Sequence, residues 1–135
     1  MRKFRLSKKE KLKSKKNFQK VYLKGQILFS SQKKIKANYY FESSLNEKGI
    51  KAAFVVSKKA GNAVWRNRVK RLFREAFRTF KNELLDKCIS NNQLLLIIFS
   101  PNLLNQKNNK KIKLDFIIHD FVDLIYKMKS KVKNA

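Results

Sequence analysis

The chain has little cysteine, glycine or proline, and these shortages exclude several classes of protein. Cys88 is the only cysteine among 135 residues, which excludes an intrachain disulfide framework and a cysteine-based zinc site. There are three glycines, and Gly61 stands too far from the others to form the Gly-rich loop that cradles phosphates. We therefore expect a reducing environment and no nucleotide-binding loop of that type.

Long apolar runs are also missing. The longest, Leu94–Phe99, is far too short to cross a bilayer. The N-terminus is basic, but no long apolar run follows it, so it does not read as a secretory signal. We therefore expect a cytoplasmic protein with no membrane partner.

Acidic residues are scarce: 9 Asp and Glu stand against 34 Lys and Arg, which gives a formal net charge of +25. Self-repulsion of that size weakens a compact state, so a polyanionic partner is the economical explanation. Disorder alone does not fit, because 43% of the residues are hydrophobic and 11 are Phe. The apolar content and the length predict one domain over residues 1–135. Residues 1–12 are expected to form a flexible basic arm and residues 129–135 a frayed basic tail.

The hydrophobic pattern predicts an α/β (α+β) two-layer sandwich, with a four-stranded sheet and three helices. Ser14 is expected to cap the first helix, Gly25 to stop it, and Asn62 to cap the second helix. Residues 102–111 are expected to form a polar loop. The expected order is helix 14–23, strands 27–30, 36–43 and 51–57, helix 63–80, strand 93–99 and helix 112–128.

The stretch Ser57–Arg78 is the most informative, because it predicts a helix with one apolar and one basic side. At 100° per residue, the apolar stripe carries Trp65, Val69, Leu72, Phe73, Ala76, Phe77 and Phe80. The opposite side carries Asn67, Lys70, Arg71, Arg74 and Arg78, and its N-terminal flanks carry Arg66 and Arg68. Such a helix can bury one face and present the other to polyphosphate. A merely solubilising face is the weaker interpretation, because mixed charges solubilise with less repulsion.

Catalytic side chains are hard to find in this sequence. His119 is the only histidine, and Asp115 and Asp123 lie four positions before and after it on the last predicted helix. These three side chains could bind a divalent ion, or one of them could act as a general base. A solvated helix face is the favoured interpretation. Cys88 has no basic activator nearby in the sequence and is expected to be inert. We therefore expect a binding protein, or an accessory to another molecule's chemistry.

The central motif resembles the signature of the bacterial ribonuclease P protein subunit. The resemblance rests on Ser57–Glu75, whose centre is Arg66-Asn67-Arg68 followed by Lys70-Arg71, and on Asn17–Gly25 after Arg5-Leu6. It implies an α/β sandwich in which a strand–helix–strand unit crosses over with the rare left hand, contrary to the usual rule. The crossover helix would here be Ala63–Phe80.

The resemblance also implies a function in tRNA maturation. In that family the RNA subunit cuts precursor tRNA to leave the mature 5′ end, with magnesium ions held mainly by RNA and substrate. The protein binds that RNA and the single-stranded 5′ leader, and no side chain of the protein is catalytic. The implied partners are the catalytic RNA subunit and precursor tRNA, with no obligate protein partner.

Two groups of residues match the binding sites of the family. The resemblance and the phosphate affinity of basic side chains assign contacts with the RNA subunit to Lys58, Lys59, Asn62, Arg66, Asn67, Arg68, Lys70, Arg71 and Arg74. Leader contacts are assigned to Phe18, Tyr22 and Tyr40, whose rings can stack on any base. Core packing is the other interpretation for Phe18 and Tyr22. Strand alternation separates Tyr40 from Tyr39 and Phe41 but leaves open which side faces the leader; the resemblance favours Tyr40.

Two other functions stay open. A ribosomal or other structural RNA-binding protein would be equally basic, and it would prefer ribosomal RNA fragments to the ribonuclease P RNA. A nuclease that uses Asp115, His119 and Asp123 would cleave precursor tRNA without an RNA subunit, and His119→Ala would abolish the cleavage.

Overall fold

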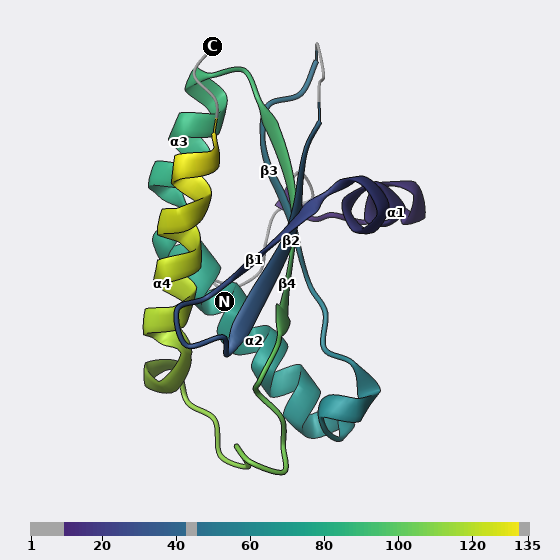
Figure 1. The fold of residues 1–135 in the computed structure, drawn as a ribbon, viewed down its shortest axis with the longest axis vertical. Helices are drawn as coiled ribbons and strands as arrows, with labels where there is room; N and C mark the ends of the chain where they lie inside the picture. The colour runs from purple at the N-terminus through teal and green to yellow at the C-terminus, as the bar shows by residue number, and fades with distance from the viewer. Residues whose placement is uncertain (1–9, 43–45, 133–135) are drawn as a thin grey trace, which may run out of the picture.

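A computed structural model describes residues 10–42 and 46–132 of the chain. Its centre is a four-stranded mixed sheet with the strand order β1-β2-β4-β3 (Figure 1). The strands are β1 (Gln26–Phe29), β2 (Ile35–Glu42), β3 (Gly49–Phe54) and β4 (Leu94–Pro101). The helices are α1 (Lys15–Lys24), α2 (Ala63–Phe80), α3 (Asn82–Ser90) and α4 (Leu114–Lys131), with a short 3₁₀ helix η2 (Lys58–Ala60).

The pairing of the strands defines the topology. β2 runs antiparallel to β1 and to β4, whereas β3 and β4 are parallel neighbours. Parallel neighbours need a crossover connection, and α2 and α3 supply it here. The predicted α/β sandwich with four strands is confirmed, and the left hand of the crossover stays a prediction from the family resemblance.

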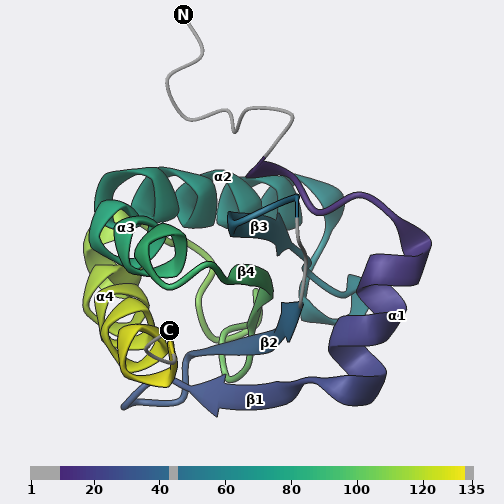
Figure 2. The same ribbon diagram turned by 90° about the horizontal axis from the view of Figure 1, so that it is seen from above.

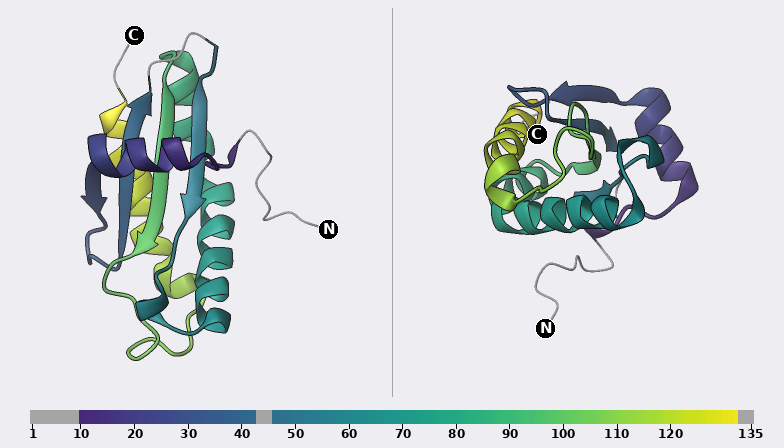
Figure 3. Two further views of the ribbon diagram at one scale, coloured as in Figure 1. Left: turned by 90° about the vertical axis from the view of Figure 1, so that its right-hand side faces the viewer. Right: turned by 90° about the horizontal axis from the view of Figure 1, so that it is seen from below.

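The two faces of the sheet are covered differently. Figure 2 shows α3 and α4 against one face and α1 against the other, and in Figure 3 α1 runs across the strands. The main core lies under α2, α3 and α4, where the ring of Phe121 contacts both Phe73 of α2 and Phe99 of β4. A smaller cluster lies under α1 and includes Val21 of the helix and Leu96 of β4. We call this side of the sheet, together with α1 itself, the α1 face.

Both predicted boundary residues of α1, the start at Ser14 and the stop at Gly25, are confirmed. Ser14 caps the helix through its Oγ, which accepts from the Asn17 N–H at 3.4 Å. Gly25 ends the helix at φ −82°, a value that any residue adopts. Glycine is needed there because a Cβ would collide with the main-chain oxygens of Tyr39 and Val21. Close approach of two backbones, not a left-handed turn, explains this residue.

The prediction of three helices is wrong, because the described residues form a fourth helix, α3, directly after α2. α3 begins directly after Lys81 and buries only Leu84 and Cys88. Two buried positions in nine residues leave too short a periodic pattern to identify a helix from sequence. The break also changes the end of α2: Phe80, predicted on the apolar stripe, is 37% exposed.

The predicted boundaries of the arm and tail need correction as well. Residues 1–9 and 133–135 lie outside the described part, but Leu12 is buried and its N–H donates to the Ala52 oxygen at 3.0 Å. Residues 10–12 are therefore docked on β3 instead of belonging to a flexible arm. At the other end, α4 begins at Leu114 instead of residue 112 and continues to Lys131, and Val132 is buried. The predicted tail is helical up to that point.

Candidate nucleic-acid interface

The cations predicted to bind the RNA subunit lie on η2 and on the outer side of α2. The helix places six apolar side chains in the core, from Trp65 to Phe77, which turns the opposite face to solvent. Lys58, Lys59, Asn67, Arg68 and Arg71 are exposed, and Arg66, Lys70 and Arg74 are half-buried. We call this set the basic surface: Lys58, Lys59, Arg66, Asn67, Arg68, Lys70, Arg71 and Arg74.

Two arginines of the basic surface are held by main-chain oxygens. Arg66 Nη1 donates to the Gly61 oxygen at 3.1 Å, and Arg68 Nε donates to the Ile112 oxygen at 2.7 Å. A guanidinium has five N–H donors, so one bond to the backbone leaves the others for a ligand. These bonds already restrict the rotamers of each arginine, so less side-chain entropy is lost when the arginine binds a ligand.

Asn62 has a structural role. Its Oδ1 accepts from the Trp65 N–H at 2.9 Å, which confirms Asn62 as the N-cap of α2. An oxygen engaged in capping is less available to RNA, and the predicted RNA contact of Asn62 stays a prediction. Gly61, just before it, has an extended backbone with φ 172°. A Cβ there would lie 2.7 Å from the Trp65 ring, so close packing explains this glycine instead of a positive φ.

The charges of the basic surface are not neutralised within residues 10–42 and 46–132. The ion pairs there join other cations to carboxylates: Lys20 to Glu42, Lys34 to Asp120, Lys51 to Glu47, Lys81 to Glu10, Lys127 to Asp123 and Lys129 to Glu83. Partial burial lowers the pKa of Arg74 from its ordinary value. Arginine nevertheless stays protonated in proteins near neutral pH. The cations thus gather on one helix face without acidic neighbours in contact.

The three predicted leader-binding aromatics belong to the α1 face. Phe18 and Tyr40 are half-buried against the small cluster under α1, and Tyr22 is 51% exposed. Tyr39 and Phe41 lie on the other face, where their rings meet edge to face at a centroid distance of 5.9 Å. The structure therefore places Tyr40, and neither of its neighbours, on the side of α1. Phe18 packs on that cluster, as the core interpretation predicts, and its contact with the leader stays a prediction.

A depression beside α1 contains a residue that sequence reasoning missed. It is lined by Tyr22, Lys36, Asn38, Val55, Ser57, Ala60, Ser100 and Pro101. Asn38 is only 7% exposed, and no hydrogen bond of its side chain is found within the described part of the chain. Since Asn38 and Tyr40 are two positions apart on β2, the alternation of the strand could have indicated that they share a face. Ala60 lies in the same depression, which connects the α1 face to η2.

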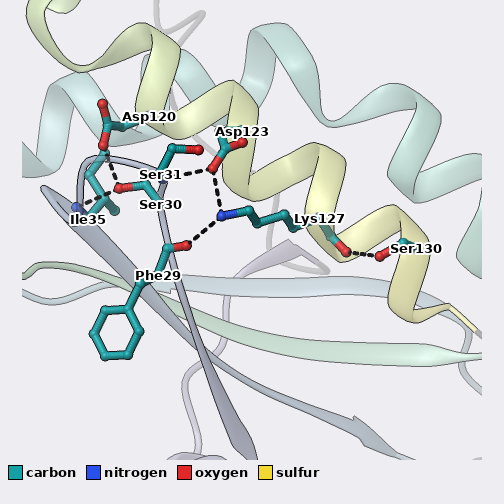
Figure 4. Close-up of polar contacts among 8 residues, drawn as sticks. All are labelled: Phe29, Ser30, Ser31, Ile35, Asp120, Asp123, Lys127 and Ser130. Atoms are coloured by element: carbon teal, nitrogen blue, oxygen red, sulfur yellow. Dashed lines mark hydrogen bonds and ion pairs between the residues drawn. The ribbon is translucent and has the colours of Figure 1, made fainter.

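Asp115, His119 and Asp123 of α4 do not form a metal site. In the part of the chain that the structure describes, no three His, Cys, Asp or Glu side chains come together in a way that could hold a metal ion. Asp123 instead accepts from the Ser31 N–H at 2.9 Å and pairs with Lys127 at 3.0 Å (Figure 4). Burial raises the pKa of Asp123, but its bonds with Lys127 and Ser31 outweigh that effect and lower the pKa overall. Asp115 and His119 are exposed.

Asp120, next to this triplet, fastens the β1–β2 turn to α4. It is buried and accepts from Ser30 Oγ at 2.5 Å, and the same hydroxyl accepts from the Ile35 N–H at 3.2 Å. Asp120 and Asp123 thus both bind the β1–β2 turn to α4 (Figure 4). Among the described helices, none is long and apolar enough to cross a membrane.

A cationic helix that no described carboxylate neutralises, on a small α/β sandwich with aromatic side chains on the α1 face, is typical of proteins that bind nucleic acid. Comparison with known proteins identifies the family within this class. The sequence model of the family described as Ribonuclease P matches residues 6–119. The chain belongs to this family of bacterial ribonuclease P protein components.

Individual relatives agree with the family match. The ribonuclease P protein component of Bacillus pumilus is 42% identical over 72 residues, which cover 53% of this chain and 57% of the relative. That of Macrococcus caseolyticus is 39% identical over 75 residues, which cover 56% of this chain and 62% of the relative. The match thus spans less than two thirds of the length of these relatives.

Solved structures show the same fold. The RNase P protein of Staphylococcus aureus has a TM-score of 0.60 and 26% identity, with 93% of this chain and 98% of that chain covered. The RNase P protein of Thermotoga maritima has a TM-score of 0.67 at 19% identity, with 87% and 96% covered. At that identity the second comparison supports the fold alone.

Proposed function

We propose that this chain is the protein subunit of a ribonuclease P ribonucleoprotein, which removes the 5′ leader from precursor tRNA. The basic surface binds the catalytic RNA subunit, and the α1 face holds the leader. The observation that carries the proposal is that one fold presents two separate surfaces. Cations that pair with no described carboxylate lie on α2, and aromatic side chains lie beside α1. Membership of the family supports it.

The basic surface suits the backbone of a folded RNA. Arg66, Arg68, Arg71 and Arg74 can each make paired contacts with phosphate oxygens, while lysines act as point charges. Asn67 is exposed beside them and adds hydrogen-bond capacity. Such contacts set the position of the protein without reading a sequence. They therefore fit a partner that is recognised by shape.

The α1 face suits a single strand. Tyr22 offers an exposed ring, and Tyr40 and Phe18 extend the aromatic surface over α1 and β2. Stacking of a base on such a ring is worth about 1–3 kcal/mol and tolerates any sequence. Lys36 and Asn38 in the adjoining depression add a charge and an amide. These groups fit leaders whose sequences differ from one tRNA to the next.

Bond cleavage is assigned to the RNA subunit and to magnesium ions held mainly by RNA and substrate phosphates. The described residues do not bring together the cluster of carboxylates that a protein-held metal site requires. The contribution of the chain is to bring two RNAs together and to offset their negative charge. As part of this ribonucleoprotein it belongs to an endoribonuclease, and the cytoplasm is its proposed location.

Reconstitution tests the proposal. The chain is mixed with a transcript of a bacterial ribonuclease P RNA, and cleavage of precursor tRNA is measured at low magnesium. We expect cleavage only when both are present; no stimulation by the chain would contradict the proposal. Competition with a ribosomal RNA fragment of equal length checks specificity, because a structural RNA-binding protein would prefer that fragment.

A double variant, Arg66→Ala with Arg68→Ala, tests the assignment of the basic surface. The slope of log affinity against log salt should fall by roughly 0.7–0.9 for each lost phosphate contact. Lys48→Ala with Lys131→Ala is the matched control, because both lysines are exposed and neither belongs to η2 or α2. Equal slopes for the two double variants would remove Arg66 and Arg68 from the interface.

A further inference from the structure

The connection between β4 and α4 carries basic residues that the proposed interface does not yet include. Residues 102–113, called the Asn/Lys loop below, contain Lys107, Lys110, Lys111 and Lys113 and no acidic residue. They also contain asparagine at 102, 105, 108 and 109, and no aromatic residue. The loop thus offers cations and amides but no ring for base stacking.

The loop has a defined conformation of its own. Leu104 and Ile112 are buried and anchor its two ends in the core. Between them, the Asn109 N–H donates to the Asn105 oxygen at 2.8 Å, and the Asn108 N–H donates to Asn105 Oδ1 at 2.9 Å. Asparagine side chains often close turns in this way. The lysines between the anchors are therefore carried on a closed turn.

This turn is fastened to the start of α2. The Gln106 N–H donates to the Ala60 oxygen at 2.7 Å, and Gln106 Oε1 accepts from the Asn62 N–H at 2.8 Å. The indole N–H of Trp65 donates to the Asn109 oxygen at 2.8 Å. In Figure 3 the loop lies beside η2 at one end of the molecule. Together with the bond from Arg68 to Ile112, these contacts hold the loop and the basic surface in one fixed arrangement.

A shallow depression marks the junction. It is lined by Lys59, Ala60 and Gly61 from the η2 side and by Asn105, Gln106, Lys107 and Lys110 from the loop. Within the described residues, no carboxylate pairs with any of its lysines. Cations from two distant parts of the sequence thus face the same hollow without neutralisation.

We propose that the Asn/Lys loop is a second phosphate-binding element, which grips the backbone of a folded RNA together with Lys59. A folded RNA is preferred to the single-stranded leader because the loop has charge but no stacking surface, and phosphate contacts alone position a structured backbone. The inference rests on the proposed function, since that RNA is the catalytic subunit. The proposed interface then includes the Asn/Lys loop as well as η2 and α2, and the loop lies next to the start of α2.

The first test removes charge. Lys107→Ala with Lys110→Ala is compared with the control pair Lys48→Ala and Lys131→Ala for binding to a bacterial ribonuclease P RNA transcript. Two lost contacts should lower the salt slope by roughly 1.4–1.8 in total and weaken binding roughly twentyfold at 0.15 M salt. A variant that binds like the control pair overturns the inference. If the unmodified chain prefers ribosomal RNA, the proposed function fails and this inference fails with it.

The second test adds a negative charge without removing a lysine. Gln106→Glu keeps an oxygen that accepts from the Asn62 N–H, and a carboxylate is favoured at a helix N-terminus. We therefore expect an unchanged or raised melting temperature together with severalfold weaker RNA binding. Unchanged binding by this folded variant would overturn the inference, because a carboxylate among phosphate-binding lysines must repel the RNA.

The third test separates placement from charge. Trp65→Phe removes the indole N–H that holds Asn109 but keeps an aromatic ring in the core and all the lysines. If the loop acts through its fixed position, RNA binding weakens while its salt slope changes little. Full affinity in this variant would show that the docking of the loop is irrelevant to binding and would overturn the proposed grip.

Discussion

Arg68 Nε donates a hydrogen bond to the main-chain oxygen of Ile112 at 2.7 Å, across 44 positions of the sequence. This bond gives Arg68 a second role besides the one assigned by the sequence motif. It joins the second turn of α2 to the buried Ile112, which lies two residues before α4 begins. Arg71 is exposed on the same helix and is not seen to make such a bond within the described residues.

The first prediction compares these two arginines. Arg68→Ala should lower the free energy of unfolding by about 1–2 kcal/mol, because a partly buried carbonyl loses a charged donor. Arg71→Ala should leave stability unchanged within about 0.5 kcal/mol. Both should weaken RNA binding to a similar degree. Denaturant unfolding and RNA titration of the two variants measure this, and equal losses of stability would show that the bond to Ile112 contributes nothing.

The second prediction concerns the leader. Tyr22→Ala should weaken binding of precursor tRNA with a leader of several nucleotides by about 1–3 kcal/mol, the worth of one base stack. Binding of a substrate with almost no leader should change little. Because Tyr22 is 51% exposed, the variant should fold normally.

Tyr39 is the matched control for this experiment. It lies on the opposite face of β2, is buried, and donates from its hydroxyl to Gln26 Oε1 at 2.9 Å. Tyr39→Ala should therefore destabilise the fold and affect both substrates equally. The same pattern in Tyr22→Ala would mean a folding defect and would remove Tyr22 from the leader site.

The sequence predicted α2 well because the signal there is long and local. Asn62 caps the helix and Phe80 ends it, as predicted, since eighteen residues with one apolar stripe leave little ambiguity. α3 was missed because it adds fewer than three turns directly after Lys81. The side of β2 that faces α1 could not be chosen from alternation alone, which separates Tyr40 from Tyr39 without orienting either.

The docking of the Asn/Lys loop lay beyond sequence reasoning for a different reason. The side-chain bonds that hold it to α2 join Asn62 to Gln106, Trp65 to Asn109 and Arg68 to Ile112, each 44 positions apart. No local pattern encodes such pairs. The composition of the loop indicated only that it is polar and basic, and its place in the interface became visible when the fold brought the two segments together.

The third prediction separates two glycines. Gly25→Ala should destabilise the fold by about 3 kcal/mol or more, because the new methyl group would collide with backbone oxygens of Val21 and Tyr39, which cannot rotate away. Gly61→Ala should cost less, about 1–2 kcal/mol, because its obstacles are the side chains of Trp65 and Gln106. Thermal unfolding of both variants tests the order. A Gly61→Ala variant that is the less stable of the two would contradict it.

The last prediction concerns Cys88, which was expected to be inert. Its side chain is 0% exposed, and burial raises the pKa of its thiol to about 11 from 9.0, with Lys87 opposing the shift. The thiolate is the reactive form. A thiol pKa that is higher by about two units leaves roughly a hundredfold less thiolate below pH 9. Native protein should therefore react with a thiol reagent only as fast as it opens, and denatured protein at once.

The same shift predicts how stability depends on pH. The unfolded chain ionises Cys88 near its ordinary pKa of 9.0, whereas the folded chain keeps the proton up to about 11. Above pH 9 the unfolded state therefore binds fewer protons, and stability falls as pH rises through this window. Cys88→Ala lacks this contribution, so the difference in unfolding free energy between the two proteins should shift in favour of the variant between pH 9 and 11. A difference that stays constant over that range would show that the thiol ionises equally easily in both states.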